Sequence, residues 1–483
     1  MKHNFKPLED ILGDRITTDE LECQLYGTDL APLPKIINLL FKTVPDAVVR
    51  PGNTKEISEI MKFANKNKIY VTPRASATSA LGNAVPTRGG IVMDMSSLDN
   101  EIEINEEEKT ALLSPGVVWH KLEKSLNRKN LTTITYPSSA PSATVGGWLS
   151  SPGYGIGSIK YGSVYSQVLG MEVVLPNGTI RQLSGKEKYN FLGTEGTTGI
   201  ITGVKLKVRD IPEKLSHHLL KFNTPENFCS TIQKLVKINP FNISYADKTY
   251  IEMIKNAVED KQNNINQDFK FKSLIIFDGS EKEVCESIKN LNKIKNSDNI
   301  KEQSPELAKK EWEERFKPMR IKRRGPTLLA GDLLVPLKNL NTVIKKLNGL
   351  NISKLGIEGT VVAENKVVVM PMYLTDERKF LDFIFSLRHL KKMNDIAISA
   401  GGIPYGTGLW NSPYLNKILE REEFNKKVAF KRKFDKNNIL NPDKHLGSGL
   451  AVPSLIFNPK IYGLSMLAAE VVSKPLSFMG IIR

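Results

Sequence analysis

The chain has 483 residues, of which 40% are hydrophobic and 25% are charged. These fractions are typical of a folded globular protein, and they exclude a wholly disordered or collagen-like chain. Lys and Arg number 68 against 52 Asp and Glu, which gives a net charge of +16. The one dense basic cluster, Arg320, Lys322, Arg323 and Arg324, has no interleaved aromatic residues on which bases could stack. We therefore expect a solvated or partner-facing surface and no nucleic-acid partner.

Other features of composition bear on the compartment. No uncharged apolar run reaches the length of about 18 residues that a spanning helix needs. The first residues have neither the apolar core nor the cleavage site of a signal peptide. Cys23, Cys229 and Cys285 lie far apart and cannot supply the four thiolates of an iron–sulfur cluster. We expect a cytoplasmic protein, with peripheral membrane association as the alternative.

The first half of the chain alternates strands and helices. After a helical lead-in (residues 1–42), an α+β domain is expected over residues 43–213. Its strands are expected at 46–51, 69–74, 90–96 and 199–210, and a helix capped by Thr54 at 54–68. Residues 168–183 predict a hairpin, because Asn177-Gly178 separates two alternating runs.

A second α+β domain is expected over residues 214–446. Strands are predicted at 217–222, 273–279, 327–337 and 361–374, and helices at 227–238, 282–295, 340–350 and 378–393. This alternation indicates a sheet covered by helices on one face. The tail, 447–483, is apolar but interrupted by charges and prolines. We expect it to dock on a partner subunit or at the membrane interface, and the alternative is a strap across the chain's own cap.

Three loops of the first domain are rich in small residues. They cover residues 73–79, 136–162 and 193–202. Small residues let successive backbone N–H groups point into one concavity, as a pyrophosphate requires, and let a ligand approach the backbone. Each loop alone is about as compatible with a simple surface turn. None is a GxGxxG at the start of a helix, which disfavours a Rossmann nicotinamide site.

The loops occur together with three further motifs: Tyr26-Gly27-Thr28-Asp29, the segment from Pro45 to Pro51, and Phe434-Asp435 followed by Asn441-Pro442. In this combination the chain resembles the FAD-linked oxidases of the glycolate oxidase flavin subunit and D-lactate dehydrogenase type, over residues 15–446. The resemblance implies an α+β fold. It consists of a bipartite FAD-binding domain of the p-cresol methylhydroxylase type and a ferredoxin-like α+β cap domain, which binds substrate.

The resemblance also implies which residues bind FAD. The first loop would hold the pyrophosphate, the second the pyrophosphate and flavin, and the third the adenosine and ribitol. The residues are Arg74, Ala75, Ser76, Ala77, Thr78, Ser79, Pro137, Ser138, Ala143, Thr144, Gly146, Gly147, Ser150, Gly153, Tyr154, Gly155, Gly157, Glu195, Gly199, Ile200 and Ile201. The family has more glycine where Ala75 and Ala77 lie, and alanine fits if φ is negative. With no His or Cys in the loops, non-covalent FAD is expected.

The cap departs from the family at its metal-associated segments. In this chain they are 362–371 and 401–410, and neither contains a histidine, so no metal is expected. Arg315, in a Trp-x-x-Arg segment, is the candidate for binding a substrate carboxylate. Tyr373, Tyr405 and Trp410 are candidates for lining the flavin. Arg315, Tyr373 and Tyr405 are the candidate catalytic residues.

The implied function is an FAD-dependent oxidoreductase. A hydroxyacid or sugar-derived alcohol would give a hydride to flavin N5 while a basic group takes the hydroxyl proton. The electrons would pass to an external iron–sulfur protein, electron-transfer flavoprotein or quinone. The alternative, favoured by the missing histidines, is a flavin-bearing electron-transfer or scaffold subunit with a degenerate substrate site.

Overall fold

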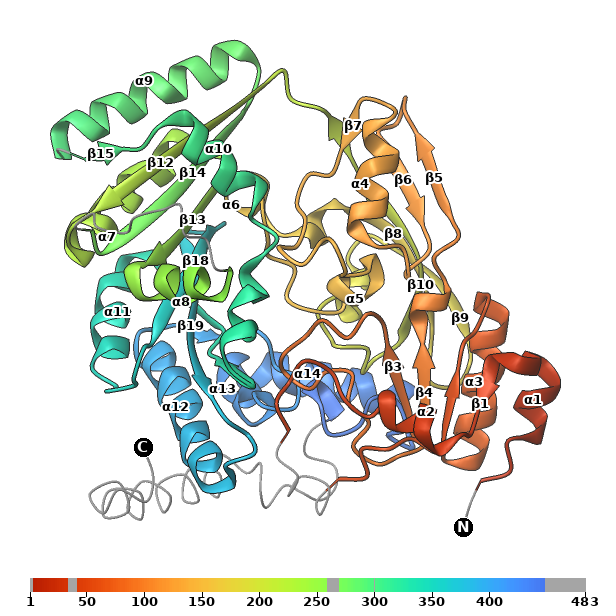
Figure 1. The fold of residues 1–483 in the computed structure, drawn as a ribbon. Coiled ribbons are helices and arrows are strands. Elements are labelled where there is room, and N and C mark those ends of the chain that lie inside the picture. The colour runs from red at the N-terminus through yellow and green to blue at the C-terminus, as the bar shows by residue number, and fades with distance from the viewer. Residues whose placement is uncertain (1–2, 34–40, 259–268, 299, 448–483) are drawn as a thin grey trace. The chain divides into compact units, whose positions relative to one another are not determined.

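The computed structural model describes residues 3–33, 41–258, 269–298 and 300–447. These residues form two compact units, whose elements are labelled in Figure 1. Unit 1 contains the residues up to Gly153, Val164–Asp210 and the described residues from Gly406 onward. Unit 2 contains Tyr154–Ser163 and Ile211–Tyr405.

Unit 1 begins with a small sheet in the order β1-β2-β4-β3, in which β2, β4 and β3 are parallel. The elements are α1 (Lys6–Leu12), β1 (Ile16–Thr17), α2 (Glu20–Leu25), β2 (Ala47–Val49), α3 (Thr54–Asn67), β3 (Val71–Arg74) and β4 (Ile91–Asp94). The apolar face of α3 packs with these strands into one core, as its helical spacing predicts. Asn53 caps α3, not Thr54 as expected, because its side chain accepts a hydrogen bond from the Glu56 N–H.

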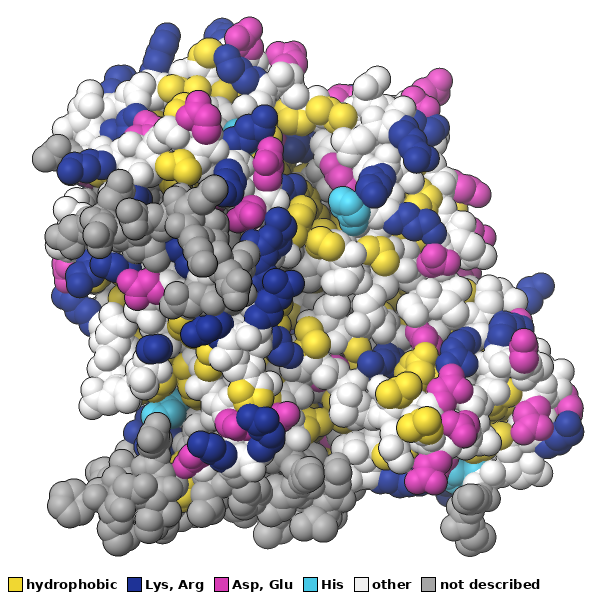
Figure 2. All heavy atoms as spheres, viewed as in Figure 1, with side chains coloured by type: hydrophobic (Ala, Val, Ile, Leu, Met, Phe, Trp, Pro, Cys, Tyr) yellow, Lys and Arg dark blue, Asp and Glu magenta, His cyan; other side chains and the backbone are white. Residues whose placement is uncertain are grey.

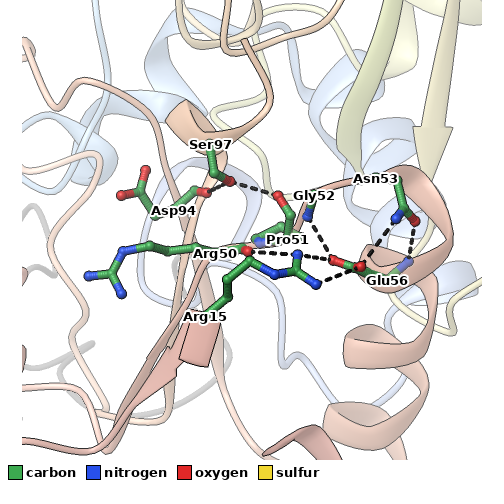
Figure 3. A network of polar contacts seen from close by, with 8 residues as sticks. All are labelled: Arg15, Arg50, Pro51, Gly52, Asn53, Glu56, Asp94 and Ser97. Carbon is green, nitrogen blue, oxygen red and sulfur yellow. Dashed lines mark hydrogen bonds and ion pairs between the residues drawn. The ribbon is translucent and has the colours of Figure 1, made fainter. Parts of the chain in front are cut away.

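An ion pair fixes the turn between β2 and α3 (Figure 3). The guanidinium of Arg15 binds both carboxylate oxygens of Glu56, at 2.5 and 2.9 Å, and also donates to the Arg50 carbonyl at 3.3 Å. Glu56 in turn accepts the Gly52 N–H at 2.7 Å. The side chain of Arg50 extends away from this pair, and its guanidinium binds Glu22 and lies over the Tyr26 ring.

A second, antiparallel sheet of unit 1 has the order β5-β6-β10-β8-β9. Its elements and their neighbours are β5 (Ile102–Asn105), β6 (Thr110–Leu113), α4 (Trp119–Asn127), β7 (Leu131–Thr132), α5 (Val145–Leu149), β8 (Val168–Val174), β9 (Ile180–Ser184), β10 (Ile200–Lys207) and β11 (Arg209–Asp210). The predicted hairpin around Asn177-Gly178 is confirmed as β8–β9. Gly178 has φ +84°, which explains why glycine stands there.

Unit 2 is built on one antiparallel sheet whose main path is β15-β12-β14-β13-β18-β19-β17-β20, with β16 also paired to β19. The strands are β12 (Lys214–Phe222), β13 (Asn242–Asp247), β14 (Phe271–Gly279), β15 (Lys301–Glu302), β16 (Thr327–Ala330), β17 (Leu333–Pro336), β18 (Gly356–Val362), β19 (Lys366–Thr375) and β20 (Ile403–Pro404). Two expected single strands are pairs in the structure. Residues 327–337 break at Gly331-Asp332 into β16 and β17, and 361–374 fold back after Val362 as the β18–β19 hairpin.

Helices lie on both faces of this sheet. The predicted helices form α7 (Pro225–Leu235), α9 (Glu281–Asp298), α11 (Leu340–Asn348) and α12 (Phe380–Ser399), which pack with one another on one face. Here Phe228 of α7 stacks on Phe271 of β14 with ring centroids 4.6 Å apart. The expectation of helices on one face alone is wrong, because α6 (Ser158–Tyr161), α8 (Lys248–Val258) and α10 (Pro305–Glu313) contact the strands from the other side. We call this second side the candidate substrate face, because the resemblance implies that the cap domain binds substrate.

The chain's last described segment returns to unit 1. After α13 (Leu415–Ile418) and α14 (Arg421–Phe434), Leu440 pairs in parallel with Val71 of β3. Unit 1 therefore includes residues from Gly406, which the expected division had placed in the 214–446 cap. The expected tail, 447–483, and part of the lead-in lie outside the described residues. No helix of the described residues has the length and apolar character needed to cross a membrane.

Candidate FAD site and substrate face

The first loop offers a row of backbone donors directly after β3. Among the described residues, none accepts a hydrogen bond from the N–H groups of Ser76, Ala77, Thr78 or Ser79. Ala77 has φ +50°, so the condition of negative φ does not hold at this position. A left-handed residue within such a loop turns neighbouring N–H groups toward one side, as in the anion-binding nests of proteins. The loop therefore has the donor set that a diphosphate needs.

Arg74, at the start of this loop, is directed toward the Tyr26 motif. Its guanidinium donates to the Thr28 carbonyl at 2.5 Å and lies 5.4 Å from the centre of the Tyr26 ring. Arg50 lies 5.6 Å from the same ring, and the Tyr26 hydroxyl donates to Asp94 at 2.8 Å. Burial lowers the pKa of Arg74 from its ordinary value. The motif thus orders both arginines beside the first loop.

The second loop meets the first at Gly147. Thr144 caps α5 by accepting the Gly147 N–H at 3.1 Å. A Cβ on Gly147 would lie 3.1 Å from the Cβ of Ala75, so glycine lets the two loops approach. Glycine stands at position 146 for a different reason, because a Cβ there would be 2.6 Å from the Pro115 side chain. The predicted residues Pro137, Ser138 and Ala143 lie in the turn before Thr144, where the Ala140 and Ala143 N–H groups donate to the Pro137 and Ser139 carbonyls.

The third loop contacts both others. A Cβ on Gly196 would be 2.9 Å from the Pro73 ring, and the Glu195 N–H donates to the Ser150 carbonyl at 2.8 Å. Two side chains assigned to FAD contact are engaged elsewhere. Ile200 packs in the core of unit 1, and the Glu195 carboxylate accepts hydrogen bonds from Thr407 and Gly408. Gly199 lies against the Phe191 ring. The backbone of Glu195 is engaged as well, and Ile200 pairs with Val174 of β8, so FAD contact by these residues stays a prediction.

The three loops together fit an FAD. They bring uncommitted N–H donors, hydroxyls and small residues to one region of unit 1, which suits a diphosphate and a flat ring placed against backbone. The remaining residues of the predicted set are divided between the two units. Tyr154, Gly155 and Gly157 belong to unit 2, while Gly153 belongs to unit 1.

The two tyrosines proposed for catalysis have structural partners. The Tyr405 hydroxyl accepts the Tyr154 N–H and donates to the Tyr154 carbonyl, both at 2.8 Å, which attaches this segment to the sheet. The Tyr373 hydroxyl donates to the Ser386 carbonyl of α12 at 2.7 Å. Because side chains alternate along a strand, Tyr373 lies on the face covered by α12 and not beside Met370 on the opposite face. Its assignment to the flavin stays a prediction.

Arg315, just after α10, has its guanidinium over two aromatic rings. Its guanidinium carbon lies 4.1 Å from the centre of the Trp312 ring and 4.2 Å from that of Phe316. One nitrogen donates to the Trp312 carbonyl at 2.8 Å. The Trp312 ring also neighbours His217 of β12, which places this group at the candidate substrate face. Trp410, the remaining aromatic candidate, is half-buried in unit 1.

Two carboxyl groups at the candidate substrate face were not among the residues predicted from the sequence. Burial raises the pKa of Glu358 on β18 to about 7, although a hydrogen bond from Tyr250 lowers this pKa. Burial likewise raises the pKa of Asp332, between β16 and β17, to about 7, and its Oδ1 has no partner among the described residues. Glu358 sits between Ala246 and Met370 in the register of neighbouring strands. A separate strand predicted over the residues of β18 would have placed Glu358 among apolar positions.

The other predicted features of unit 2 also have definite places. The metal-associated segment 362–371 runs along the β18–β19 hairpin, where Val362 and Val368 join an apolar cluster. Within the described ranges, no three His, Cys, Asp or Glu side chains gather so as to hold a metal ion. The basic cluster follows α10, and Figure 2 shows Lys and Arg side chains gathered over this stretch, with Arg323 and Arg324 exposed.

Comparison with known proteins identifies the class. The model of the FAD binding domain matches residues 45–184, and that of the FAD linked oxidases' C-terminal domain matches residues 211–445. The two stretches account for most of the chain. The chain belongs to the FAD-linked oxidases, and it is an FAD-dependent oxidoreductase with the α+β fold expected from the sequence.

Individual relatives refine this picture. The chain is 28% identical over 424 residues to glycolate oxidase subunit GlcD of Bacillus subtilis, covering 84% of this chain and 89% of that one. It is 24% identical over 472 residues to the mitochondrial D-lactate dehydrogenase (cytochrome) of Arabidopsis thaliana, covering 92% and 80%. p-Cresol methylhydroxylase with bound substrate has the same fold, with a TM-score of 0.75, 16% identity and coverage of 92% and 96%. An alkyldihydroxyacetonephosphate synthase structure gives a TM-score of 0.74 at 20% identity, covering 90% and 84%.

Proposed function

We propose that the protein oxidises a small hydroxyacid and passes the electrons to an external acceptor. Relatives that span most of the chain are named for glycolate and D-lactate, which are both 2-hydroxyacids. When bound, FAD supplies the hydride acceptor. The chain's own residues must then bind the carboxylate, orient the hydroxyl-bearing carbon and accept the hydroxyl proton.

The stacked guanidinium of Arg315 is the observation that carries this proposal. Two aromatic rings and the Trp312 carbonyl restrict its rotation, so little conformational entropy is lost when it binds a carboxylate. A planar guanidinium can donate two parallel hydrogen bonds to a carboxylate. This favours an acid as substrate over a neutral alcohol.

Glu358 is the candidate proton acceptor in this proposal. A carboxyl whose pKa is about 7 is partly ionised at neutral pH and takes up a proton more readily than an ordinary glutamate. Val362, Val368 and Met370 occupy much of the neighbouring surface and offer no oxygen or nitrogen ligand. We therefore propose a reaction without a divalent metal, which predicts unchanged turnover after dialysis against EDTA.

Arg315→Lys tests the proposal directly. An ammonium keeps the charge but loses the paired geometry, so the half-saturating D-lactate or glycolate concentration for anaerobic flavin bleaching should rise about tenfold or more. Lys309→Arg, on the exposed side of α10, is the matched control and should bind as wild type. Unchanged half-saturation in Arg315→Lys would contradict carboxylate binding by Arg315. A flavin that no hydroxyacid bleaches would favour the electron-transfer or scaffold alternative.

FAD is proposed to be non-covalent, bound by the backbone of the three loops. Heat or acid should then release all of the flavin into the supernatant. Flavin that remains with the precipitated chain would contradict this.

A further inference from the structure

The carboxylate of Glu195 lies at the centre of a buried hydrogen-bond network in unit 1. Its side chain accepts the Gly408 N–H with both oxygens, at 2.8 and 2.9 Å, and the Thr407 N–H at 3.1 Å. The Thr407 hydroxyl is a further donor. Glu195 is only 6% exposed, so these donors from the C-terminal segment replace water around the carboxylate.

The backbone of Glu195 connects the same residue to other parts of the site. Its N–H donates to the Ser150 carbonyl at 2.8 Å, and its carbonyl accepts the Asn441 side chain at 2.7 Å. The residue has φ +53°, an uncommon conformation for a glutamate. The hydrogen bonds of the Glu195 N–H and carbonyl therefore hold this residue of the third loop in a backbone conformation that a glutamate otherwise avoids.

Asn83 extends the network to the first loop. Its side chain hydrogen bonds to Glu195 and also accepts the Ser79 hydroxyl at the end of that loop. The Leu409 N–H donates to the Leu81 carbonyl at 2.7 Å, so the C-terminal segment also binds the chain just after the first loop. One buried carboxylate thus joins the first loop, the third loop and the C-terminal segment.

We propose that Glu195 is a positioning residue for FAD, which acts through Asn83 and the Thr407–Gly408 segment and not by contact with the cofactor. It follows that FAD affinity is set partly by residues more than 200 positions beyond the stretch matched by the FAD-binding model, which ends at residue 184. This inference concerns the cofactor alone and does not depend on the identity of the substrate.

Glu195→Gln in the full-length protein is the test. The amide has nearly the same size, but it replaces one acceptor with a donor facing buried N–H groups. Titration of apoprotein with FAD, followed by flavin fluorescence and the visible spectrum, should give a dissociation constant raised about tenfold or more. Glu195→Asp, which keeps the carboxylate, should recover part of the affinity.

Asp443→Asn is the matched control. It weakens the ion pair between Arg88 and Asp443, whose nitrogen and oxygen are 2.7 Å apart. Asp443 lies in the same C-terminal segment but does not contact Glu195. The control should lower the melting temperature of the apoprotein with little change in FAD affinity. If Glu195→Gln fails to fold, Thr407→Val removes only the hydroxyl donor, and its FAD dissociation constant should rise by a smaller factor. FAD affinity within twofold of wild type in folded Glu195→Gln or Thr407→Val overturns the proposal, because the network would then be purely structural.

Discussion

At the residue scale, Ala77 shows how the first loop differs from its relatives. An alanine can replace the family's glycine here without strain only if its φ is negative, yet φ of Ala77 is +50°. The left-handed region costs a residue with a Cβ roughly 1–2 kcal/mol. The chain retains the conformation because it points the N–H donors of the loop to one side.

Replacing Ala77 with glycine should therefore stabilise the protein. The relief of the left-handed conformation exceeds the extra entropy of an unfolded glycine, so the free energy of unfolding should rise by about 0.5–1 kcal/mol. Urea unfolding measures this. Ala75→Gly is the control, because φ of Ala75 is not positive, and it should instead lose about 0.5–1 kcal/mol. A loss of stability in Ala77→Gly would show that its conformation is not strained.

Glu358 predicts a pH dependence of stability. Burial raises its pKa from 4.5 to about 7 in the folded protein. Between these two values the unfolded chain releases the proton while the folded chain keeps it, so this group lowers stability as pH rises from about 4.5 to 7. Glu358→Gln cannot ionise and should lose this slope. Urea midpoints measured at pH 4.5, 5.5, 6.5 and 7.5 would show this loss of slope, with the exposed Glu107→Gln as the control. If the midpoints of Glu358→Gln and wild type changed in parallel with pH, the raised pKa of Glu358 would be contradicted.

The two tyrosines show what residue type alone cannot predict. Tyr373 and Tyr405 were singled out as aromatic residues at strand ends. Tyr405 attaches the Tyr154 segment and Tyr373 binds α12, because each hydroxyl found a backbone partner. Arg315 was found from its motif, but its stacking between Trp312 and Phe316 needed the structure.

Among the elements, the end of α14 is joined to the segment after it and to the third loop by the contacts of a buried ion pair. Lys431 is 1% exposed, and its ammonium donates to Asp435 at 2.7 Å and to the carbonyls of Thr197 and Leu440 at 2.9 and 3.0 Å. Asp435 in turn accepts the Ile439 and Leu440 N–H groups. This gives a physical reason for the Phe434-Asp435 and Asn441-Pro442 motifs.

Lys431→Met should cost about 3–5 kcal/mol of folding free energy, because it leaves the Asp435 carboxylate buried without its cation. Adding Asp435→Asn removes the charge and keeps one carbonyl oxygen, which can accept one of the two N–H groups. The double variant should therefore be more stable than Lys431→Met alone, by urea unfolding. A double variant as unstable as the sum of both single changes would contradict the pairing.

Elements with local signals were predicted from the sequence. Helix α3 and the β8–β9 hairpin follow from spacing and from Asn177-Gly178. The β18–β19 hairpin was missed, because its turn uses Glu364 and Asn365 at φ +61° and +53° without a glycine. The strand formed by Leu440 beside Val71 depends on a contact between distant parts of the chain, which no local pattern shows.

At the scale of the whole molecule, sequence families and compact units divide the chain differently. The C-terminal family model extends over residues 211–445, close to the expected cap at 214–446, yet the described residues from Gly406 pack in unit 1. FAD binding by the three loops stays a prediction, but the loops themselves were predictable because each is a short motif. Their support by Thr407, Gly408 and Asn441 was not, because it arises only when distant segments fold together.

The proposal that this chain oxidises a hydroxyacid can be tested on the bound flavin itself. Its most direct test is the visible spectrum of the purified full-length protein under anaerobic conditions, during addition of D-lactate, glycolate and larger 2-hydroxyacids. We predict an oxidised flavin spectrum that at least one of these acids bleaches, with the colour restored by an artificial electron acceptor. A bound flavin that dithionite reduces but that every hydroxyacid leaves oxidised would contradict the proposal.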